Sequence, residues 1–553
     1  MPQKSLFSRP PLLSLQQSFP SPGLVRTGDE AVRRLYRNAL AYSDNPACWE
    51  GLFRLACLVT DQPADCPVYA RITACLGDSE SGAIEGNAEE QIAKARAAFA
   101  LFEYNTDRSI LRRLGKWFRY MEIEWNTVFC TGSVGFSPAD LMELLVRFYR
   151  ASGMKAVLRL CSRLRTDAFD WTTALHTVQQ GIPFRFEGED PLYAILRKRK
   201  DEIEYDEKEI LLNHAEMLAD AVRYAHFSGE FSGNGQDLSA GRYAWSFLSK
   251  HHRAACGGTT GTPYLAGASP ASPVDTRVLC AWTEAFACSL ALPDTLWAAD
   301  ELVRIVFNGL SACLRQETTP AYQLVNCLRP ETVPNGGADT CARITRAVDA
   351  AFRHAVGLTE EGVRINYLLP ARYAVMSAGR QAVISSDGQK AVIRIPSGGA
   401  VPAGLFLAST ETAEPLLLHG NETKYIESPA GAAKLVRLPE PVRNEDILSF
   451  SADGEVRTEN AHHRGITCWL RNRLLCAPVQ EGGYAYAMDQ SPSLHEGVPE
   501  ACLRETHAWK LREGEPEDIP VLPHCGENTR CATLVSYDHA GARIALFPKA
   551  HDS

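Results

Sequence analysis

The chain has 553 residues and a formal net charge of −9, with 57 Lys and Arg residues against 66 Asp and Glu residues. Its isoelectric point is about 5.9, and no basic stripe appears, which argues against nucleic acid as the main partner. A hydrophobic content of 45% and a charged content of 22% are typical of a soluble globular protein. The length exceeds what one hydrophobic core usually serves, so about two to four domains are expected.

Residues 1–25 read as an N-terminal extension that is broken by prolines and lacks the apolar stretch of a signal peptide. No run of about 18 apolar residues occurs, so no membrane span is predicted. The 17 cysteines are scattered, and many fall inside helical patterns. Such a distribution suits buried free thiols in a reducing compartment, and we expect the protein in the cytoplasm.

Residues 26–357 carry apolar residues at helical spacing, which predicts an all-helical domain. The sharpest boundary signals are Ser137-Pro138, a cap followed by proline at the first helical position, and Gly153, a helix stop. Gly229 and Gly357 are further predicted stops. The predicted helices cover residues 29–42, 88–102, 108–123, 138–152, 206–228, 275–292, 295–314 and 339–356. No fixed-length repeat appears, and a toroid of paired helices around a central pocket fits better than a solenoid.

Residues 358–553 alternate in twos between turns rich in Gly, Pro and Asn, which predicts short strands and one or two β-sandwiches. Strands are expected at 391–395, 435–438, 447–450 and 474–476. Residues 533–537 and 543–547 are expected to form a closing hairpin. The fold class is therefore α+β and multidomain, with a helical half followed by a β half.

Four stretches in order resemble the glycoside hydrolases typified by bacterial β-L-arabinofuranosidase (family 127 type). They are the segment Asn126 to Ser133, with the helix that ends at Gly153; Asn213-His214-Ala215, with the loop at Gly257-Gly258; the run Asp275 to Ala281; and Leu438-Pro439-Glu440-Pro441-Val442-Arg443, with the final hairpin. The resemblance spans roughly residues 100–550. It implies an (α/α)6 barrel followed by β-sandwiches.

The resemblance further implies a zinc ion held by one glutamate and three cysteines, with a cysteine nucleophile and a second glutamate as acid/base. This chain departs from that set. The ligand glutamate falls at Val278, residues 263–273 contain no carboxylate, and only Cys341 stands where the family has two adjacent cysteines. The resemblance therefore carries the family's fold over to this chain, whereas the family's catalytic set does not carry over.

Cys341 is the predicted nucleophile, because it lies near a helix start, where unpaired backbone N–H groups favour the thiolate. The alternative is a buried apolar cysteine. Glu284 and Asp275 are the predicted catalytic carboxylates, since cleavage of a glycosidic bond requires protonation of the leaving oxygen. Glu331 and Asp339 are the other carboxylates near the proposed site in sequence, and the choice of acid/base among the four stays open.

Zinc is a candidate cofactor. Cys280 and Glu284 lie four residues apart on one helix face, and Cys341 or Cys327 would complete a tetrahedron. The alternative is a cysteine packed in the core and a glutamate in a salt bridge. His214, Asn126 and His176 are the predicted substrate-binding residues, and a satisfied core histidine is the alternative for His214.

We therefore predict a glycoside hydrolase-like protein that acts on a terminal sugar, an L-arabinofuranoside or a related one, of a small oligosaccharide or glycoconjugate. Two alternatives stay open: a non-catalytic member that binds a sugar or a partner chain, and a sugar isomerase or lyase on the same barrel. The expected partner is a carbohydrate, with no nucleic acid and no membrane. A homodimer is an option that the sequence leaves open.

Overall fold

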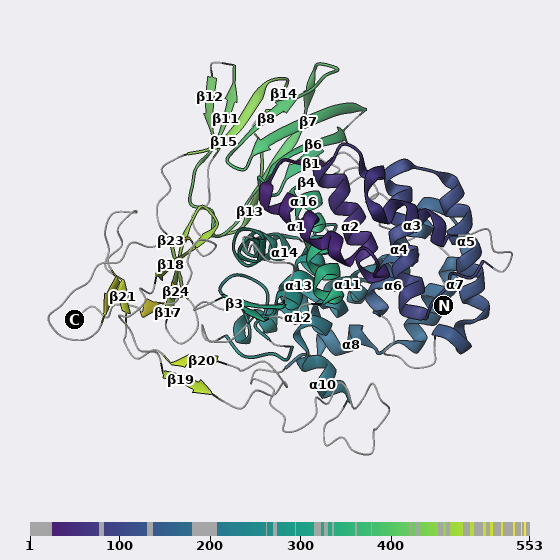
Figure 1. The fold of residues 1–553 in the computed structure, drawn as a ribbon. Helices are drawn as coiled ribbons and strands as arrows, with labels where there is room; N and C mark the ends of the chain where they lie inside the picture. The colour runs from purple at the N-terminus through teal and green to yellow at the C-terminus, as the bar shows by residue number, and fades with distance from the viewer. Residues whose placement is uncertain are drawn as a thin grey trace, which may run out of the picture.

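In a computed structural model of the chain, a mass of helices is followed by layers of strands (Figure 1). The structure describes residues 25–76, 82–129, 137–179, 207–261, 263–268, 274–292, 295–314, 322–325, 330–333, 337–359, 362–377, 379–420, 422–426, 432–438, 440–451, 457–460, 465–478, 487–490, 501–504, 509–511, 521–523, 535–536, 543–544 and 547–548.

Six helices form a closed inner ring within the described part of the chain. They are α2 (Pro46–Val59), α4 (Ala88–Asn105), α6 (Pro138–Ser152), α11 (Ala215–Ser232), α13 (Thr276–Ser289) and α16 (Ala338–Ala355). Each helix contacts the next in this order, and α16 contacts α2, which closes the ring. The predicted helical toroid is therefore confirmed.

The remaining helices pack outside the ring or connect its members. They are α1 (Glu30–Ala39), α3 (Pro67–Cys75), α5 (Arg108–Ile123), α7 (Lys155–Asp167), α8 (Trp171–His176), α10 (Glu207–Asn213), α12 (Gly235–His251), α14 (Leu296–Arg304) and α15 (Ser311–Leu314). Short 3-10 turns at Leu40–Tyr42 and Pro63–Asp65 and π-helical segments at Trp125–Phe129 and Ile305–Leu310 complete the helical part. No helix among the described residues is long and apolar enough to cross a membrane.

The boundaries of α6 are as predicted. The Ser137 side chain accepts a hydrogen bond from the backbone N–H of Asp140 at 3.3 Å, and Gly153 caps the other end with φ of +68°. The stop at Gly229 is wrong, because α11 continues to Ser232 and Gly233 takes the left-handed conformation. Gly229 instead allows close packing of α11 on α12: a Cβ there would lie 2.7 Å from the Leu238 side chain.

The join between the two halves differs from the prediction by two residues. Helix α16 ends at Ala355, and Val356 already has extended backbone angles. Gly357 therefore lies inside strand β4 (Val356–Thr359) and does not act as a left-handed helix stop. The chain passes from the last inner helix directly into the β half.

The first layers of the β half are two sheets. The seven-stranded sheet runs in the order β1 (Val25–Thr27), β6 (Pro370–Ser377), β7 (Arg380–Asp387), β8 (Lys390–Arg394), β15 (Asp446–Phe450), β11 (Pro415–His419) and β12 (Glu422–Tyr425). The four-stranded sheet runs β13 (Lys434–Arg437), β10 (Ala403–Leu407), β5 (Gly362–Ile365) and β4. Alternate residues of β6 are buried, as a sheet with one covered face requires.

A second sheet system lies closer to the C-terminus. It contains β16 (Arg457–Asn460), β17 (Gly465–Leu470), β18 (Arg473–Pro478), β23 (Val535–Ser536), β24 (Arg543–Ile544) and β25 (Phe547–Pro548). Two-stranded pairs are β9 (Ala400–Val401) with β14 (Val442–Arg443), β2 (Tyr322–Val325) with β3 (Pro330–Val333), β19 (Ala487–Gln490) with β20 (Ala501–Arg504), and β21 (Trp509–Leu511) with β22 (Val521–Pro523). The expected closing hairpin differs from this pairing, because β23 and β24 each pair with β18.

Arg304 of α14 fastens the barrel to the second sheet system. Its guanidinium group contacts Glu459 of β16 at 2.8 and 3.0 Å and the hydroxyl of Ser409 at 2.8 Å. It also lies 4.6 Å from the centre of the Trp469 ring. The side-chain amide of Asn308 adds hydrogen bonds to the backbone of Asn472 and Leu474. These contacts hold the two halves together through polar groups as well as apolar packing.

Candidate functional site

The strongest candidate site is a cavity of about 330 Å³ inside the ring of helices, here called the axial cavity. All six inner helices contribute side chains to its wall, so it lies within the ring. The contributing residues come from the middle and the last turns of these helices, which places the cavity toward the carboxyl ends of the ring. Its volume is at the small end of the range for ligand pockets, about 300–1,000 Å³.

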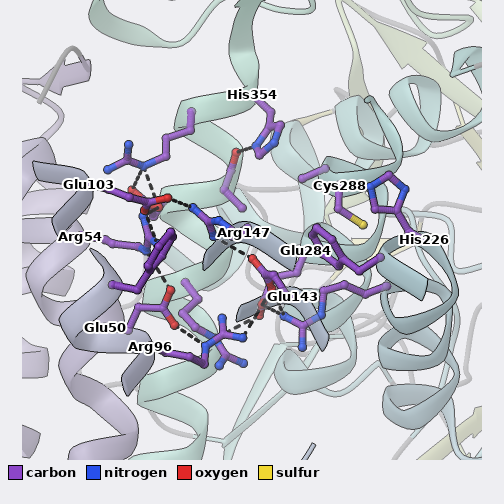
Figure 2. Close-up of a pocket in the computed structure, with 18 of the residues that line it drawn as sticks. Glu50, Arg54, Arg96, Glu103, Glu143, Arg147, His226, Glu284, Cys288 and His354 are labelled. Atoms are coloured by element: carbon purple, nitrogen blue, oxygen red, sulfur yellow. Dashed lines mark hydrogen bonds and ion pairs between the residues drawn. The ribbon is translucent and has the colours of Figure 1, made fainter. Parts of the chain in front are cut away.

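Charged groups of both signs dominate the wall. The acids are Glu50, Glu103, Glu143, Glu230, Glu284 and Asp349, and the arginines are Arg54, Arg96, Arg147, Arg150, Arg223, Arg346 and Arg353. Phe99, Phe102 and Phe227 add aromatic surface, and His226, Cys288 and His354 add the remaining reactive side chains. Figure 2 shows His226 and Cys288 on one side of the cavity and Glu50 with Arg96 on the opposite side.

One half of the wall is a chain of alternating charges that passes from α2 to α4 and α6. Glu50 accepts hydrogen bonds from Arg54 at 3.0 Å and from Arg96 at 2.7 Å. Arg54 also donates to Glu103 at 2.9 Å, and Arg147 bridges Glu103 to Glu143. Burial alone would raise the pKa of Glu50, but the guanidinium groups of Arg96 and Arg54 outweigh it and hold the pKa well below its usual value.

Arg223 of α11 is the centre of the other half. It donates hydrogen bonds to Glu284 of α13, to Asp140 of α6 and to Asp220 one turn earlier in α11. Its side chain is 2% exposed. Nearby carboxylates, Asp140 and Glu284 first, keep its pKa raised although burial opposes this. The guanidinium group is therefore a permanent buried cation that four carboxylates share, the fourth being Glu143 at 3.5 Å.

In the part of the wall formed by α11 and the end of α6, three neighbouring residues each have an unpaired polar atom, whereas Arg223, Glu284 and Arg346 have one such atom each within the ion-pair network. Glu230 lies 2.8 Å from Arg150 and 3.5 Å from the Nε2 atom of His226. Its Oε2 atom, the Nδ1 atom of His226 and the Nε atom of Arg150 have no hydrogen-bond partner among the described residues. Glu230 is 1% exposed and His226 is 4% exposed. Buried polar atoms without a hydrogen-bond partner are rare in native proteins.

Among the predicted site residues that the structure describes, Glu284 is the one that lines the axial cavity. Asp275 instead caps α13, accepting a hydrogen bond from the backbone of Arg277 at 2.8 Å. His214 caps α11, where its Nδ1 atom accepts from the backbone of Met217 at 3.3 Å. Both caps stand at the amino ends of inner helices, the opposite end from the cavity.

The predicted cysteines also lie near the amino ends of inner helices and outside the wall of the cavity. Cys341 is fully buried beside Cys48, and the hydrogen bond between the thiols, together with burial, raises its pKa. The lowered pKa expected from the helix start does not occur. Cys280 is fully buried, and burial followed by the nearby Cys313 raises its pKa. Cys327 lies outside the described residues.

The two weaker substrate-binding candidates are remote from the wall of the axial cavity. Asn126 is exposed in the π-helical segment at Trp125–Phe129. His176, near the end of α8, lies with its Nε2 atom 3.0 Å from the carbonyl oxygen of Gln236 and its ring 4.6 Å from that of Tyr243. Neither contributes to the cavity wall.

The described part of the predicted zinc set does not fit a zinc ion. Glu284 accepts from Arg223, and its other oxygen lies 3.5 Å from Arg346 and 3.8 Å from Arg343. A divalent cation there would face three guanidinium groups. Zinc also requires thiolates, whereas burial favours the protonated form of Cys280. Among the described residues, no cluster of three or more His, Cys, Asp or Glu side chains could hold a metal.

Sequence reasoning missed the cavity residues other than Glu284, although several of them share a signal. Four inner helices carry a pair of polar side chains four positions apart on the inward face. Three are ion pairs, Glu50 with Arg54, Glu143 with Arg147 and Asp349 with Arg353, and the fourth is the contact of His226 with Glu230. Residues at this spacing lie on one helix face. Repeated charges at such positions, within faces that are otherwise apolar, indicate a polar pocket.

Comparison with solved structures shows the fold. One chain described as a glycoside hydrolase matches with a TM-score of 0.67 and 13% identity, covering 98% of this chain and 99% of that one. A family 127 β-L-arabinofuranosidase from Geobacillus stearothermophilus T6 matches with a TM-score of 0.59 and 13% identity, covering 94% of each chain. A family 127 β-arabinofuranosidase matches with a TM-score of 0.63 and 12% identity, covering 97% of this chain and 98% of that one.

No protein-family model matches the sequence, and no curated protein matches it. The likeness to the three solved structures extends over nearly the whole chain, so the barrel and the β half share the arrangement of these enzymes. This confirms the predicted (α/α)6 barrel followed by a β-sandwich region. At 12–13% identity the likeness concerns the fold.

Proposed function

We propose that this protein is a glycoside hydrolase-like protein that binds the terminal sugar of a small oligosaccharide or glycoconjugate in the axial cavity. The observation that carries the proposal is a small cavity inside an (α/α)6 ring, lined from all six inner helices by carboxylates and guanidinium groups. An L-arabinofuranoside or a related sugar is the candidate substrate, because one solved structure that shares the fold is a β-L-arabinofuranosidase.

The chemistry of the wall suits a neutral polyhydroxy ligand. Each sugar hydroxyl both donates and accepts hydrogen bonds, carboxylates only accept, and guanidinium groups only donate. A wall that alternates the two can therefore satisfy neighbouring hydroxyls. Six acids against seven arginines also leave little net charge, so a strongly anionic or cationic ligand gains little there. The phenylalanine rings offer apolar surface for the C–H faces of a sugar.

Hydrolysis requires an acid that protonates the leaving oxygen and a second group that stabilises the cation-like centre. Glu284 is the carboxylate in the cavity that sequence and geometry both favour for one of these roles. Among the cavity's other groups, the imidazole of His226 is of a side-chain type that often serves as general acid or base. Cys341 is disfavoured as nucleophile, because it is buried beside Cys48 away from the wall.

The alternative is a sugar-binding protein without hydrolytic activity, and one observation favours it. Burial would raise the pKa values of Glu50, Glu103 and Glu143, but neighbouring arginines lower all three. A carboxyl group held ionised in this way accepts hydrogen bonds but is a poor general acid.

The test combines binding and turnover. Calorimetry against a panel of neutral monosaccharides, and a screen of aryl furanosides and pyranosides, should detect binding and release of the aryl group by the native protein. Ala350→Phe should abolish binding by filling the cavity without removing a charge, whereas Ala41→Phe on the exposed surface should not. Turnover lost in Glu284→Gln with binding retained would support hydrolysis. Binding without turnover on any substrate would favour the alternative, and absence of both would refute the proposal.

A further inference from the structure

Three neighbouring residues of the axial cavity with unpaired polar atoms are Arg150 of α6 and His226 and Glu230 of α11. Arg223, Glu284 and Arg346 of the same wall also have one such atom each, but these residues lie within the central ion-pair network. Arg150 and Glu230 are 2.8 Å apart, and Glu230 lies 3.5 Å from the Nε2 atom of His226. The other carboxylates with arginine partners in the wall spread their contacts over both oxygens, as Glu50 and Glu103 do. Glu230 uses only Oε1 in this way.

Each of the three residues keeps an unused hydrogen-bonding atom. The atoms are Oε2 of Glu230, Nδ1 of His226 and Nε of Arg150, none of which has a hydrogen-bond partner among the described residues. Glu230 and His226 are more than nine-tenths buried, and all three residues line the cavity. Leaving a buried polar group unsatisfied costs about 1–3 kcal/mol, and more for a charged group. A protein keeps such unpaired groups in its free state where a bound ligand supplies the missing hydrogen-bond partner.

We propose that Arg150, His226 and Glu230 form a subsite that binds two adjacent hydroxyl groups of a neutral sugar. The proposal rests on the proposed function of the cavity. One hydroxyl donates to Oε2 of Glu230, and its neighbour accepts from Arg150 through its oxygen. His226 completes the site through Nδ1, because the ring can donate or accept at that atom according to its protonation.

The same arrangement excludes charged groups at this position. A carboxylate or phosphate would be attracted by Arg150 but would face the ionised Glu230. Burial would raise the pKa of Glu230, but His226 and Arg150 lower it. An ammonium group would be attracted by Glu230 but would face the guanidinium group of Arg150. A neutral diol satisfies donor and acceptor together and leaves the charge balance unchanged.

Aromatic surface lies beside these groups. Phe227 follows His226 in the wall of the cavity, and the two rings meet edge to face at 4.9 Å. Phe102 of α4 also belongs to the wall. A sugar that directs one edge of hydroxyls to Glu230 can therefore lay its C–H surface against apolar rings. This combination distinguishes the subsite from the purely ionic part of the wall around Arg223.

The test pairs deletion of a sugar hydroxyl with a change of Glu230. Calorimetry measures the dissociation constants of D-galactose and its single deoxy analogues, and of L-arabinose, with native protein and Glu230→Gln. For one adjacent pair of hydroxyls, each deletion should weaken binding to the native protein at least tenfold. Deletion of the hydroxyl that donates to Oε2 should cost the Glu230→Gln variant less than threefold, because the amide oxygen stays on Arg150 and an NH2 group, which only donates, replaces Oε2. If Glu230→Gln proves unstable, Arg150→Lys should instead reduce the cost of deleting the neighbouring hydroxyl to less than threefold, because the lysine side chain lacks the Nε donor.

The matched control is Glu301→Gln. Glu301 is buried, pairs with Arg253 and likewise has an Oε2 atom without a hydrogen-bond partner among the described residues, but it lies outside the cavity wall. The Glu301→Gln substitution should leave the dissociation constant of every sugar unchanged. Equal losses from each deletion in native and Glu230→Gln protein would overturn the subsite while the proposed function stands. Failure of the native protein to bind any neutral sugar would overturn both.

Discussion

Arg223 on α11 donates a buried hydrogen bond to Glu284 on the neighbouring inner helix α13, so one charged pair joins two members of the ring. Asp140 on α6 contacts the same guanidinium group. One arginine thereby links three of the six inner helices. The cavity and the stability of the barrel depend on the same side chain.

Arg223→Met should destabilise the barrel strongly. The change leaves Glu284, Asp140 and Asp220 facing one another without their shared cation, and breaking a buried ion pair costs about 3–5 kcal/mol. Urea unfolding followed by circular dichroism measures the loss. Arg159→Met, at an exposed pair with Glu122, should leave the midpoint unchanged. Equal midpoints for the two variants would show that the central network contributes little.

His354 should make stability depend on pH between 6.5 and 4. Burial lowers its pKa from 6.5 to about 4, and its Nδ1 atom donates to the carbonyl oxygen of Ala350 at 2.8 Å. Within this window the unfolded chain binds a proton that the folded chain does not, so stability falls as the pH falls. Above 6.5 the ring is neutral in both states and makes no contribution. His354→Gln should flatten the profile of unfolding free energy in this window, and parallel profiles would contradict the prediction.

Cys341→Ser should retain sugar binding and any turnover. The thiol is fully buried, contacts Cys48 and does not line the axial cavity. Labelling with a thiol reagent should be slow in the native protein and fast after unfolding, because only the thiolate reacts. Loss of turnover in a variant that binds sugar normally would restore the cysteine as nucleophile.

Removal of divalent metal should not weaken sugar binding. Arg223 and Arg346 already neutralise the negative charge of the Glu284 carboxylate, which a zinc ion would otherwise neutralise. Dialysis against a chelator, followed by calorimetry and elemental analysis, measures both quantities. One zinc per chain, lost together with binding in Cys280→Ser, would refute this expectation.

Arg304→Met should loosen the barrel from the second sheet system. The variant loses the contacts with Glu459 and Ser409 and the approach to Trp469, and leaves Glu459 to the more distant Arg253 at 3.5 Å. We expect a loss of about 3 kcal/mol and separate thermal transitions for the two halves by scanning calorimetry. A single transition at the native temperature would show that apolar contacts alone join them.

The fold was largely readable from the sequence, because its signals are local. The cap at Ser137 and the stop at Gly153 depend on residues a few positions apart, and the predicted helix 108–123 matches α5. Gly229 misled the prediction, because a glycine that permits helix packing looks like a glycine that ends a helix. Tertiary contact with Leu238 decides between the two.

The site was less readable, because it is assembled from six helices distant in sequence. The apolar stripe of a helix does not show which face of that helix points into the ring. Glu284 was predicted because it lies on a motif helix, whereas Glu230 and Arg150 were not predicted. Motif positions directed attention to the amino ends of the inner helices, where His214 and Asp275 serve as caps. The cavity lies toward the other end.

Strand β1 has a consequence for the order in which the chain acquires its structure during synthesis. Val25 to Thr27 pair with Ala371 to Tyr373. The hydrogen bonds between β1 and β6 therefore cannot form until more than three hundred further residues have left the ribosome. The ring of helices is complete before then, and the early strand must stay unpaired while it forms. Unpaired strand edges invite association with other chains. A nascent chain halted just before β6 should therefore depend on chaperones more than the finished protein does.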